Sequence, residues 1–352
     1  MTARRQSLLF RLVASLLSLL VFLVVVEIVV RVAGVDTAFQ NRFFVLNRAL
    51  DYPDVFQKDR DLFWRFRPSQ VVTSEFFEGK TYRINSLGLR GEEVKSHKTK
   101  RRILTLGNSC TFGWGVSYQD TYAQQLESLL NGAYEVINGG IPGYSSFQGR
   151  RIFAKELIRL QPDIVLILFA WNDHWAAANQ IADKDQQFPP RAVIAIQNYL
   201  SRLHSYRLLK KLLLSGIEKE PDSLFDRTAP VYRVGLSDFK ENLREICRVA
   251  RSKGTTPILL TSPIPSLATY YPPGSKSPLH SFHEKYNQVM RELSVSDTVD
   301  LVDLAWEFDR YGELFDDAPN DPIHFNARGH RVAAELLAEH VRERYLSKSD
   351  AF

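Results

Sequence analysis

The chain has 352 residues, of which 45% are hydrophobic, so it is long enough for one large domain or two ordinary ones with a sizeable core. The formal net charge is +5, but basic and acidic residues are interspersed, which argues against a nucleic-acid-binding surface. Only Cys110 and Cys247 are present, so there is no disulfide framework, and the sequence does not decide whether the two pair.

Residues 1–34 have the composition of a membrane segment. The apolar stretch 8–32 is long enough to span a bilayer and contains only three charged residues, Arg11, Glu27 and Arg31. Glu27 and Arg31 are spaced to pair on one helix face. Basic residues before the stretch predict a cytoplasmic N-terminus and an extracytoplasmic body, periplasmic or at the cell surface. The alternative is a signal peptide with its cleavage site at residues 32–34. The charged residues just before that site, Glu27 and Arg31, disfavour this alternative.

Residues 35–100 are expected to form a lead-in that packs on the main domain, although substrate binding is an alternative role. Alternating apolar and charged residues predict a half-exposed strand over 59–68, and residues 81–85 form a second strand candidate. Residues 85–91 have the glycines of a turn.

From residue 101 to the end, strand and helix patterns alternate. The predicted strands are 103–107, 135–138, 163–169, 257–262 and 301–304, and the predicted helices are 120–130, 146–160, 237–253, 283–293 and 326–345. This alternation predicts an α/β fold with a doubly wound parallel sheet. Residues 175–235 interrupt it with a basic helical stretch at 199–214, and we interpret them as an insertion near the site, with a lid as one reading.

Three polar stretches follow predicted strands or precede the last helix. Ser109 comes directly after the first strand, Asn172 and Asp173 follow the third, and Asp321 and His324 precede the final helix. In an open α/β sheet the carboxyl ends of the strands carry the site. A serine alone is more often a turn or cap residue. Taken singly, Asp321 could equally be a turn-forming residue before a proline, and His324 a residue at the start of the last helix. Together they predict a catalytic triad, with Ser109 as nucleophile, His324 as base and Asp321 holding the other ring nitrogen.

The same stretches resemble the motif blocks of the SGNH (GDSL-type) hydrolase family over roughly residues 100–345. The blocks are Gly107-Asn108-Ser109 with Gly113, a central glycine at Gly143, Ala170-Trp171-Asn172-Asp173, and Asp321 to His324. Asn108 and Ala170 stand where the family usually has Asp and Gly. The lead-in resembles that of membrane-anchored bacterial members.

The resemblance implies a flavodoxin-like, five-stranded sheet of order 2-1-3-4-5 in a hydrolase domain at residues 101–352. It also implies an oxyanion hole built from the N–H groups of Ser109 and Gly143 and the side-chain amide of Asn172. Asp173 is expected to brace the loop rather than react.

The expected function is that of a serine esterase acting on a small acyl ester through an acyl-Ser109 intermediate. The substrate would be an O-acetyl group on a cell-envelope or exported polysaccharide. An O-acyltransferase is the alternative, since the triad does not choose between water and a sugar hydroxyl as acceptor. A catalytically silent membrane-anchored binding or assembly module is the third hypothesis, supported only by Asn108 and Ala170.

No cofactor or metal is expected. His280 and His283 are spaced i, i+3, but no carboxylate or cysteine cluster completes a metal site around them. Cys110 is a rival nucleophile only in principle, because the serine fits the pattern better. The sequence has no G-x-S-x-G elbow of the α/β-hydrolase fold.

Overall fold

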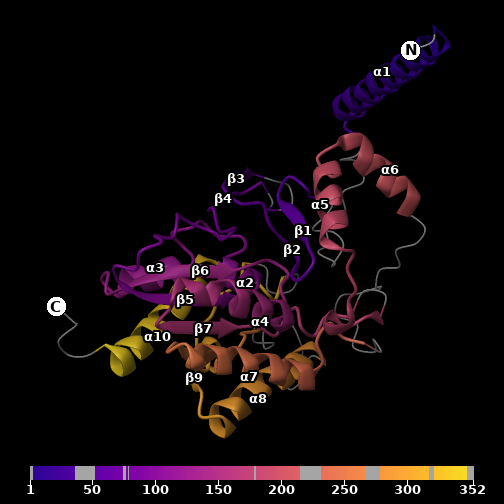
Figure 1. Cartoon of the computed structure of the whole chain (residues 1–352). Coiled ribbons are helices and arrows are strands. Elements are labelled where there is room, and N and C mark those ends of the chain that lie inside the picture. Colours follow the sequence, from indigo (N-terminus) through magenta and orange to yellow (C-terminus); the bar gives the residue numbers. More distant parts are fainter. Residues whose placement is uncertain are drawn as a thin grey trace.

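The computed structural model describes residues 3–35, 52–73, 77, 79–177, 180–214, 231–265, 278–316 and 321–346 (Figure 1). A five-stranded parallel sheet forms its centre, made of β5 (Arg101–Gly107), β6 (Tyr134–Gly140), β7 (Ile164–Leu168), β8 (Thr256–Leu260) and β9 (Asp300–Val302). The spatial order is β6-β5-β7-β8-β9, which is 2-1-3-4-5 counted along the chain. The predicted fold class and strand order are therefore confirmed.

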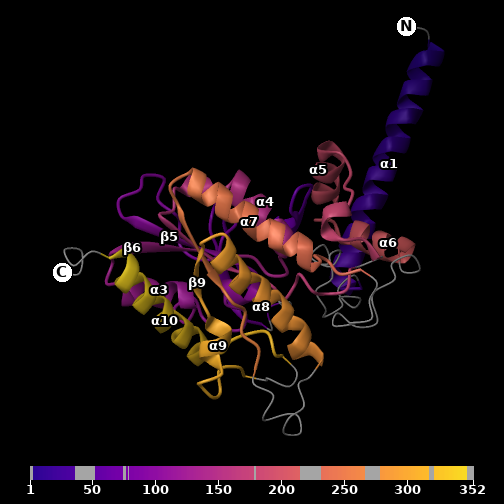
Figure 2. The same cartoon turned by 90° about the horizontal axis from the view of Figure 1, so that it is seen from below.

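Helices cover both faces of the sheet, as Figure 2 shows. One face carries α4 (Ser146–Lys155), α7 (Leu236–Ser252) and α8 (Pro278–Ser296), and the other carries α3 (Tyr122–Leu129), α9 (Leu304–Phe308) and α10 (Ala327–Tyr345). The side chains of strand β7 show why both faces of the sheet need to be covered by helices. Val165 and Ile167 belong to the first hydrophobic cluster, and Ile164, Leu166 and Leu168 belong to the second, because successive side chains of a strand point to opposite faces.

Several element boundaries differ from the prediction; the helix predicted over 283–293, for example, is α8 (Pro278–Ser296), and two of the differences lie near the candidate site. The helix expected over 146–160 ends at Lys155 and continues as a 3-10 turn, Leu157–Leu160. Strand β6 continues through Gly139 and Gly140, which pair with Leu106 and Gly107 of β5. A Cβ on Gly140 would lie 2.2 Å from the backbone nitrogen of Phe112. Glycine there lets the helix that follows β5 pack directly on the end of β6.

The lead-in folds as two hairpins rather than the single early strand expected over 59–68. Strands β1 (Phe56–Asp59) and β2 (Phe63–Phe66) pair antiparallel, as do β3 (Gln70–Thr73) and β4 (Thr81–Ile84). The early prediction is wrong because Asp59 starts a turn: its Oδ1 accepts hydrogen bonds from the N–H groups of Asp61 and Leu62, both at 2.8 Å. The strand expected at 81–85 is confirmed.

The basic stretch expected to be one helix over 199–214 lies across two helices, α5 (Arg191–Leu200) and α6 (His204–Leu214). Of the expected insertion at 175–235, residues 178–179 and 215–230 lie outside the described residues. The insertion starts and ends beside the sheet, where Ala176 and Tyr232 form an antiparallel bridge. Its helices lie away from the sheet, beside the C-terminal end of α1 (Figure 1).

Helix α1 (Ala3–Ala33) extends away from the rest of the chain in both views (Figures 1 and 2). Residues Leu8–Ala33 contain an 18-residue window with a mean hydropathy of 2.9, and the segment is long and apolar enough to cross a membrane. A signal sequence near an N-terminus has the same character. The expected pair of Glu27 and Arg31 is present, at 3.2 Å.

Candidate active site

Ser109 begins the short helix α2 (Ser109–Phe112) at the carboxyl end of β5. The side-chain oxygen of Asn108 accepts a hydrogen bond from the Cys110 N–H at 3.0 Å. This cap needs only an acceptor oxygen, so Asn serves it as well as the family's usual Asp. A Cβ on Gly107 would lie 2.1 Å from Thr111 Oγ1, so glycine is required for the chain to turn this tightly.

His324 and Asp321, far from Ser109 in sequence, lie next to it in space. His324 Nε2 is 2.8 Å from Ser109 Oγ, and His324 Nδ1 is 2.7 Å from Asp321 Oδ2. A carboxylate only accepts, so Nδ1 carries the proton and Nε2 is left to accept from the serine hydroxyl. The structure thus brings the predicted residues together in the geometry of a nucleophile, base and orienting acid.

The carboxylate of Asp321 is held in its charged form. Burial alone would raise its pKa, but hydrogen bonds from the His324 ring and from two backbone N–H groups hold that pKa below its usual value. The two backbone donors are Ile323 and His324, at 3.1 and 3.2 Å from Oδ1. Asp321 can therefore both orient the imidazole and stabilise it when it becomes positively charged.

Trp114 and Cys110 complete the surroundings of the triad and were not predicted to do so. The Trp114 ring stacks on the His324 imidazole, with centroids 5.6 Å apart and planes 23° apart. The Cys110 thiol donates to the Ile323 carbonyl at 3.2 Å, which joins α2 to the loop that carries His324. Burial raises the pKa of Cys110, so it stays a neutral thiol, which disfavours it as the nucleophile.

The three expected oxyanion donors lie at the carboxyl ends of the adjacent strands β5, β6 and β7. Gly143 has φ = +80°, a conformation that favours glycine. Within the part of the chain that the structure describes, the N–H groups of Ser109 and Gly143 donate to no acceptor. The Asn172 amide donates to the Tyr144 carbonyl at 3.0 Å and has a second N–H. Buried donors without partners suit a site that binds negative charge.

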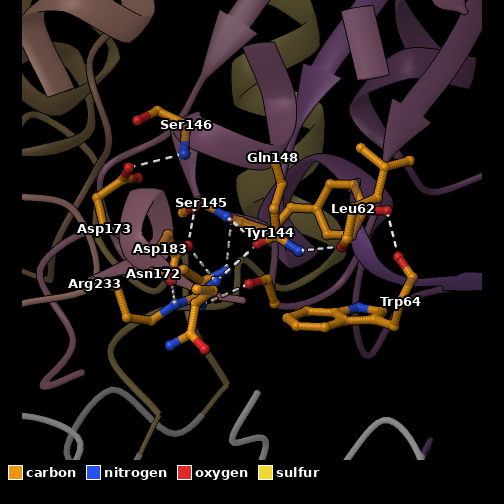
Figure 3. A network of polar contacts seen from close by, with 12 residues as sticks. Leu62, Trp64, Tyr144, Ser145, Ser146, Gln148, Asn172, Asp173, Asp183 and Arg233 are labelled. Atoms are coloured by element: carbon orange, nitrogen blue, oxygen red, sulfur yellow. Dashed lines mark hydrogen bonds and ion pairs between the residues drawn. The ribbon is translucent and has the colours of Figure 1, made fainter. Parts of the chain in front are cut away.

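A buried ion pair supports the loop that contains Gly143 (Figure 3). Arg233 Nη1 donates to the Gly143 carbonyl at 2.8 Å, while Nη2 is 2.9 Å from Asp183 Oδ2 and 2.8 Å from Gln148 Oε1. The side chains of Arg233 and Asp183 are 5% and 0% exposed. Ser145 Oγ also donates to Asp183, at 2.6 Å. Asp183, near the start of the insertion, and Arg233, near its end, thus fix the position of the Gly143 carbonyl.

The β1–β2 hairpin of the lead-in holds the same loop from the other side (Figure 3). Tyr144 OH donates to the Trp64 carbonyl at 2.6 Å, and Gln148 Nε2 donates to the Leu62 carbonyl at 2.7 Å. Trp64 Nε1 donates to the Pro142 carbonyl at 3.2 Å. Further along, the buried Arg90 guanidinium donates to the carbonyls of Phe112 and Val116, both at 2.8 Å, beneath α2. The lead-in packs against the site's supporting backbone.

Asp173 braces the end of β7. One carboxylate oxygen accepts from the Ser146 N–H at 2.8 Å and the other from the Ala170 N–H at 3.2 Å. Burial raises the pKa of Asp173 to about 7. Ala170 itself has φ = +127°, which explains why a glycine is the family's usual residue at this position.

Four other histidines have hydrogen-bond partners within the fold. His283 Nδ1 is 2.9 Å from His174 Nε2, and His283 Nε2 donates to the Ser262 carbonyl at 2.8 Å. His330 accepts from the Tyr122 N–H at 3.2 Å, and His340 is 2.7 Å from Asp300. Among the described residues, no group of His, Cys, Asp and Glu is arranged to hold a metal ion.

A comparison with protein-family models agrees with the motifs. A sequence model of the GDSL-like lipase/acylhydrolase family matches residues 105–332. Among solved structures, the lipase/acylhydrolase from Enterococcus faecalis is 19% identical with a TM-score of 0.45, over 69% of this chain and 96% of that one. The acetylxylan esterase Axe2 from Geobacillus stearothermophilus is 16% identical with a TM-score of 0.45, over 70% of this chain and 95% of that one. No curated protein matches the chain.

Proposed function

Because the chain belongs to the GDSL-like lipase/acylhydrolase family, a family of carboxylic ester hydrolases, we propose that it is a serine esterase whose triad is Ser109, His324 and Asp321. The observation that carries the proposal is the continuous hydrogen-bonded chain from Ser109 Oγ through His324 to Asp321, at 2.8 and 2.7 Å. A silent binding module has no physical need for this arrangement.

In the proposed reaction, Ser109 Oγ attacks the ester carbonyl carbon while His324 Nε2 takes the hydroxyl proton. The carbonyl oxygen becomes an oxyanion and accepts from the N–H groups of Ser109 and Gly143 and from the Asn172 amide. Loss of one such donor typically costs about 3 kcal/mol of transition-state stabilisation. His324 returns its proton to the departing alcohol, which leaves acyl-Ser109. A water molecule, deprotonated by His324, then hydrolyses this ester and releases the acid.

The proposed substrate is a small acyl ester, an O-acetyl group on a cell-envelope or exported polysaccharide. The membrane-spanning character of residues Leu8–Ala33 of α1, preceded by Arg4 and Arg5 in its first turn, supports an anchored enzyme with its body outside the cytoplasm. Trp114 lies against His324 and offers an apolar face beside the reacting group. The same ring can stabilise the imidazolium that forms during catalysis.

The test uses the full chain in detergent, treated with a fluorophosphonate probe and assayed with p-nitrophenyl acetate. Labelling and turnover should disappear in Ser109→Ala and persist in Ser117→Ala, which changes an exposed serine bonded to Asp120. A panel of longer p-nitrophenyl esters should show falling kcat/KM with acyl length. No labelling of the folded wild-type chain would refute the proposal. Acetyl transfer to an added sugar, in preference to water, would identify an acyltransferase instead.

A further inference from the structure

Helices α5 and α6 form a basic, amphipathic pair beside the C-terminal end of α1 (Figures 1 and 2). Residues 191–214 contain five Lys and Arg residues and no Asp or Glu. Their exposed apolar side chains include Ile196 and Tyr199 on α5, and Leu209, Leu212 and Leu213 on α6. The three leucines recur at i, i+3 and i+4, so they share one helix face. Basic residues beside an exposed apolar face are typical of helices that lie on a membrane.

The first turn of α6 is attached to α1 by Glu27. One carboxylate oxygen of Glu27 accepts from the His204 N–H at 3.0 Å. The other accepts from the Ser205 N–H at 2.9 Å and from the Ser205 hydroxyl at 2.7 Å. Since these bonds satisfy the otherwise unpaired N–H groups of a helix start, α6 begins at the level of Glu27.

This attachment sets the depth of α6 relative to the apolar part of α1. Leu8 to Glu27 is a run of twenty residues. At about 1.5 Å per residue such a helix is about 30 Å long, which equals the thickness of a bilayer's hydrocarbon core. Glu27 would then lie at the edge of the hydrocarbon layer, and α6 would start where lipid chains meet headgroups. Amphipathic helices bind at this boundary.

We propose that α5 and α6 lie on the surface of the bilayer that α1 crosses, with Leu209, Leu212 and Leu213 inserted below the headgroups. Arg202 and Lys210 would contact lipid phosphates, whereas Arg207 pairs with Asp54 at 2.9 Å. A second copy of the chain is a poorer occupant of this face. It would bring two clusters of positive charge together, since residues 191–214 carry no acidic residue. A phospholipid surface offers both the apolar layer and the negative groups.

The pair also connects the membrane surface to the site. Asn198 of α5 exchanges two hydrogen bonds with the Lys58 backbone of β1, at 2.8 and 2.9 Å. Strand β1 pairs with β2, whose Trp64 is bonded to the loop that contains Gly143. Helices seated on the bilayer would hold the esterase body at a fixed height and orientation, through contacts independent of the triad.

The test measures membrane depth on the full chain, reconstituted in vesicles of phosphatidylcholine and phosphatidylglycerol in equal parts. Single cysteines labelled with an environment-sensitive fluorophore replace Leu212, Leu19 within α1, or Val295, which is 84% exposed on α8. The native Cys110 and Cys247 are buried, so the unmodified chain serves as the labelling control. The label at 212 should be quenched by brominated lipid and should show several-fold weaker quenching by aqueous iodide than the label at 295.

The outcomes separate the possible explanations. If the label at 212 is as accessible to iodide as the label at 295 while the label at 19 is in lipid, the surface helices are refuted and the anchor stands. If the label at 19 is also in water, α1 is no span and the proposal fails with it. Energy transfer between copies labelled at 212, persisting on dilution with lipid, would assign the face to a second chain and overturn the proposal. None of these readings uses esterase activity, so they are independent of the proposed triad.

Discussion

Removing the guanidinium of Arg233 should destabilise the fold and slow the reaction together. In Arg233→Met the Asp183 carboxylate, 0% exposed, would stay buried without its cation. Breaking such a pair by removing one partner costs about 3–5 kcal/mol, against a typical total stability of about 5–15 kcal/mol. The Gly143 carbonyl also loses its 2.8 Å donor, so the oxyanion N–H beside it is less well positioned. We expect kcat to fall about 10- to 100-fold, less than the full loss of one oxyanion donor.

The assay is urea unfolding of the full chain in detergent, followed by tryptophan fluorescence, together with steady-state kinetics. Arg83→Met is the matched control, since Arg83 and Glu92 form a pair that is 58% and 67% exposed. Adding Asp183→Asn to Arg233→Met should recover part of the lost stability, because the unpaired charge disappears. Equal losses for Arg233→Met and Arg83→Met, or no recovery in the double variant, would refute the reasoning.

Three further predictions concern the site itself. Asn172→Ala should lower kcat on the order of 100- to 1,000-fold with little change in KM, because the amide acts on the oxyanion, and steady-state kinetics with p-nitrophenyl acetate would show it. Trp114→Ala should lower kcat about five- to thirty-fold, since a ring against a cation contributes about 1–2 kcal/mol, and an unchanged kcat would contradict this role. For Asp173, burial raises the pKa to about 7, so between about pH 4 and pH 7 the folded state keeps a proton that the unfolded state releases. Its contribution to stability is therefore lost as pH rises through this window. The free energy of unfolding, measured from pH 4 to 8, should decrease less steeply with pH in Asp173→Asn than in wild type.

The parallel sheet and the candidate site residues at one of its edges are predictable from the amino-acid sequence. The continuous apolar run of β7 predicts a strand buried on both faces, and strand–helix alternation predicts a parallel sheet. In such a sheet the carboxyl ends of neighbouring strands meet at one edge. Ser109 and Asn172 each follow one of these strands, and the strand order implied by the family resemblance makes the two strands neighbours, as the structure confirms. Asp321 and His324 are predicted as site residues because a serine nucleophile needs a base and an orienting acid, and because their block before the last helix resembles the family's motif.

The contacts that support this edge cannot be predicted from local sequence patterns. Arg233 and Asp183 are far apart in the chain, and each has the local sequence of an ordinary surface charge. The contact between Glu27 and the start of α6 likewise joins residues 177 positions apart. The turn at Asp59 and the strand through Gly140 depend on which backbone groups lie beside them. A charged or small residue has the same local pattern whether it is solvated or buried, so its partner and its energetic role exist only once distant segments are packed together.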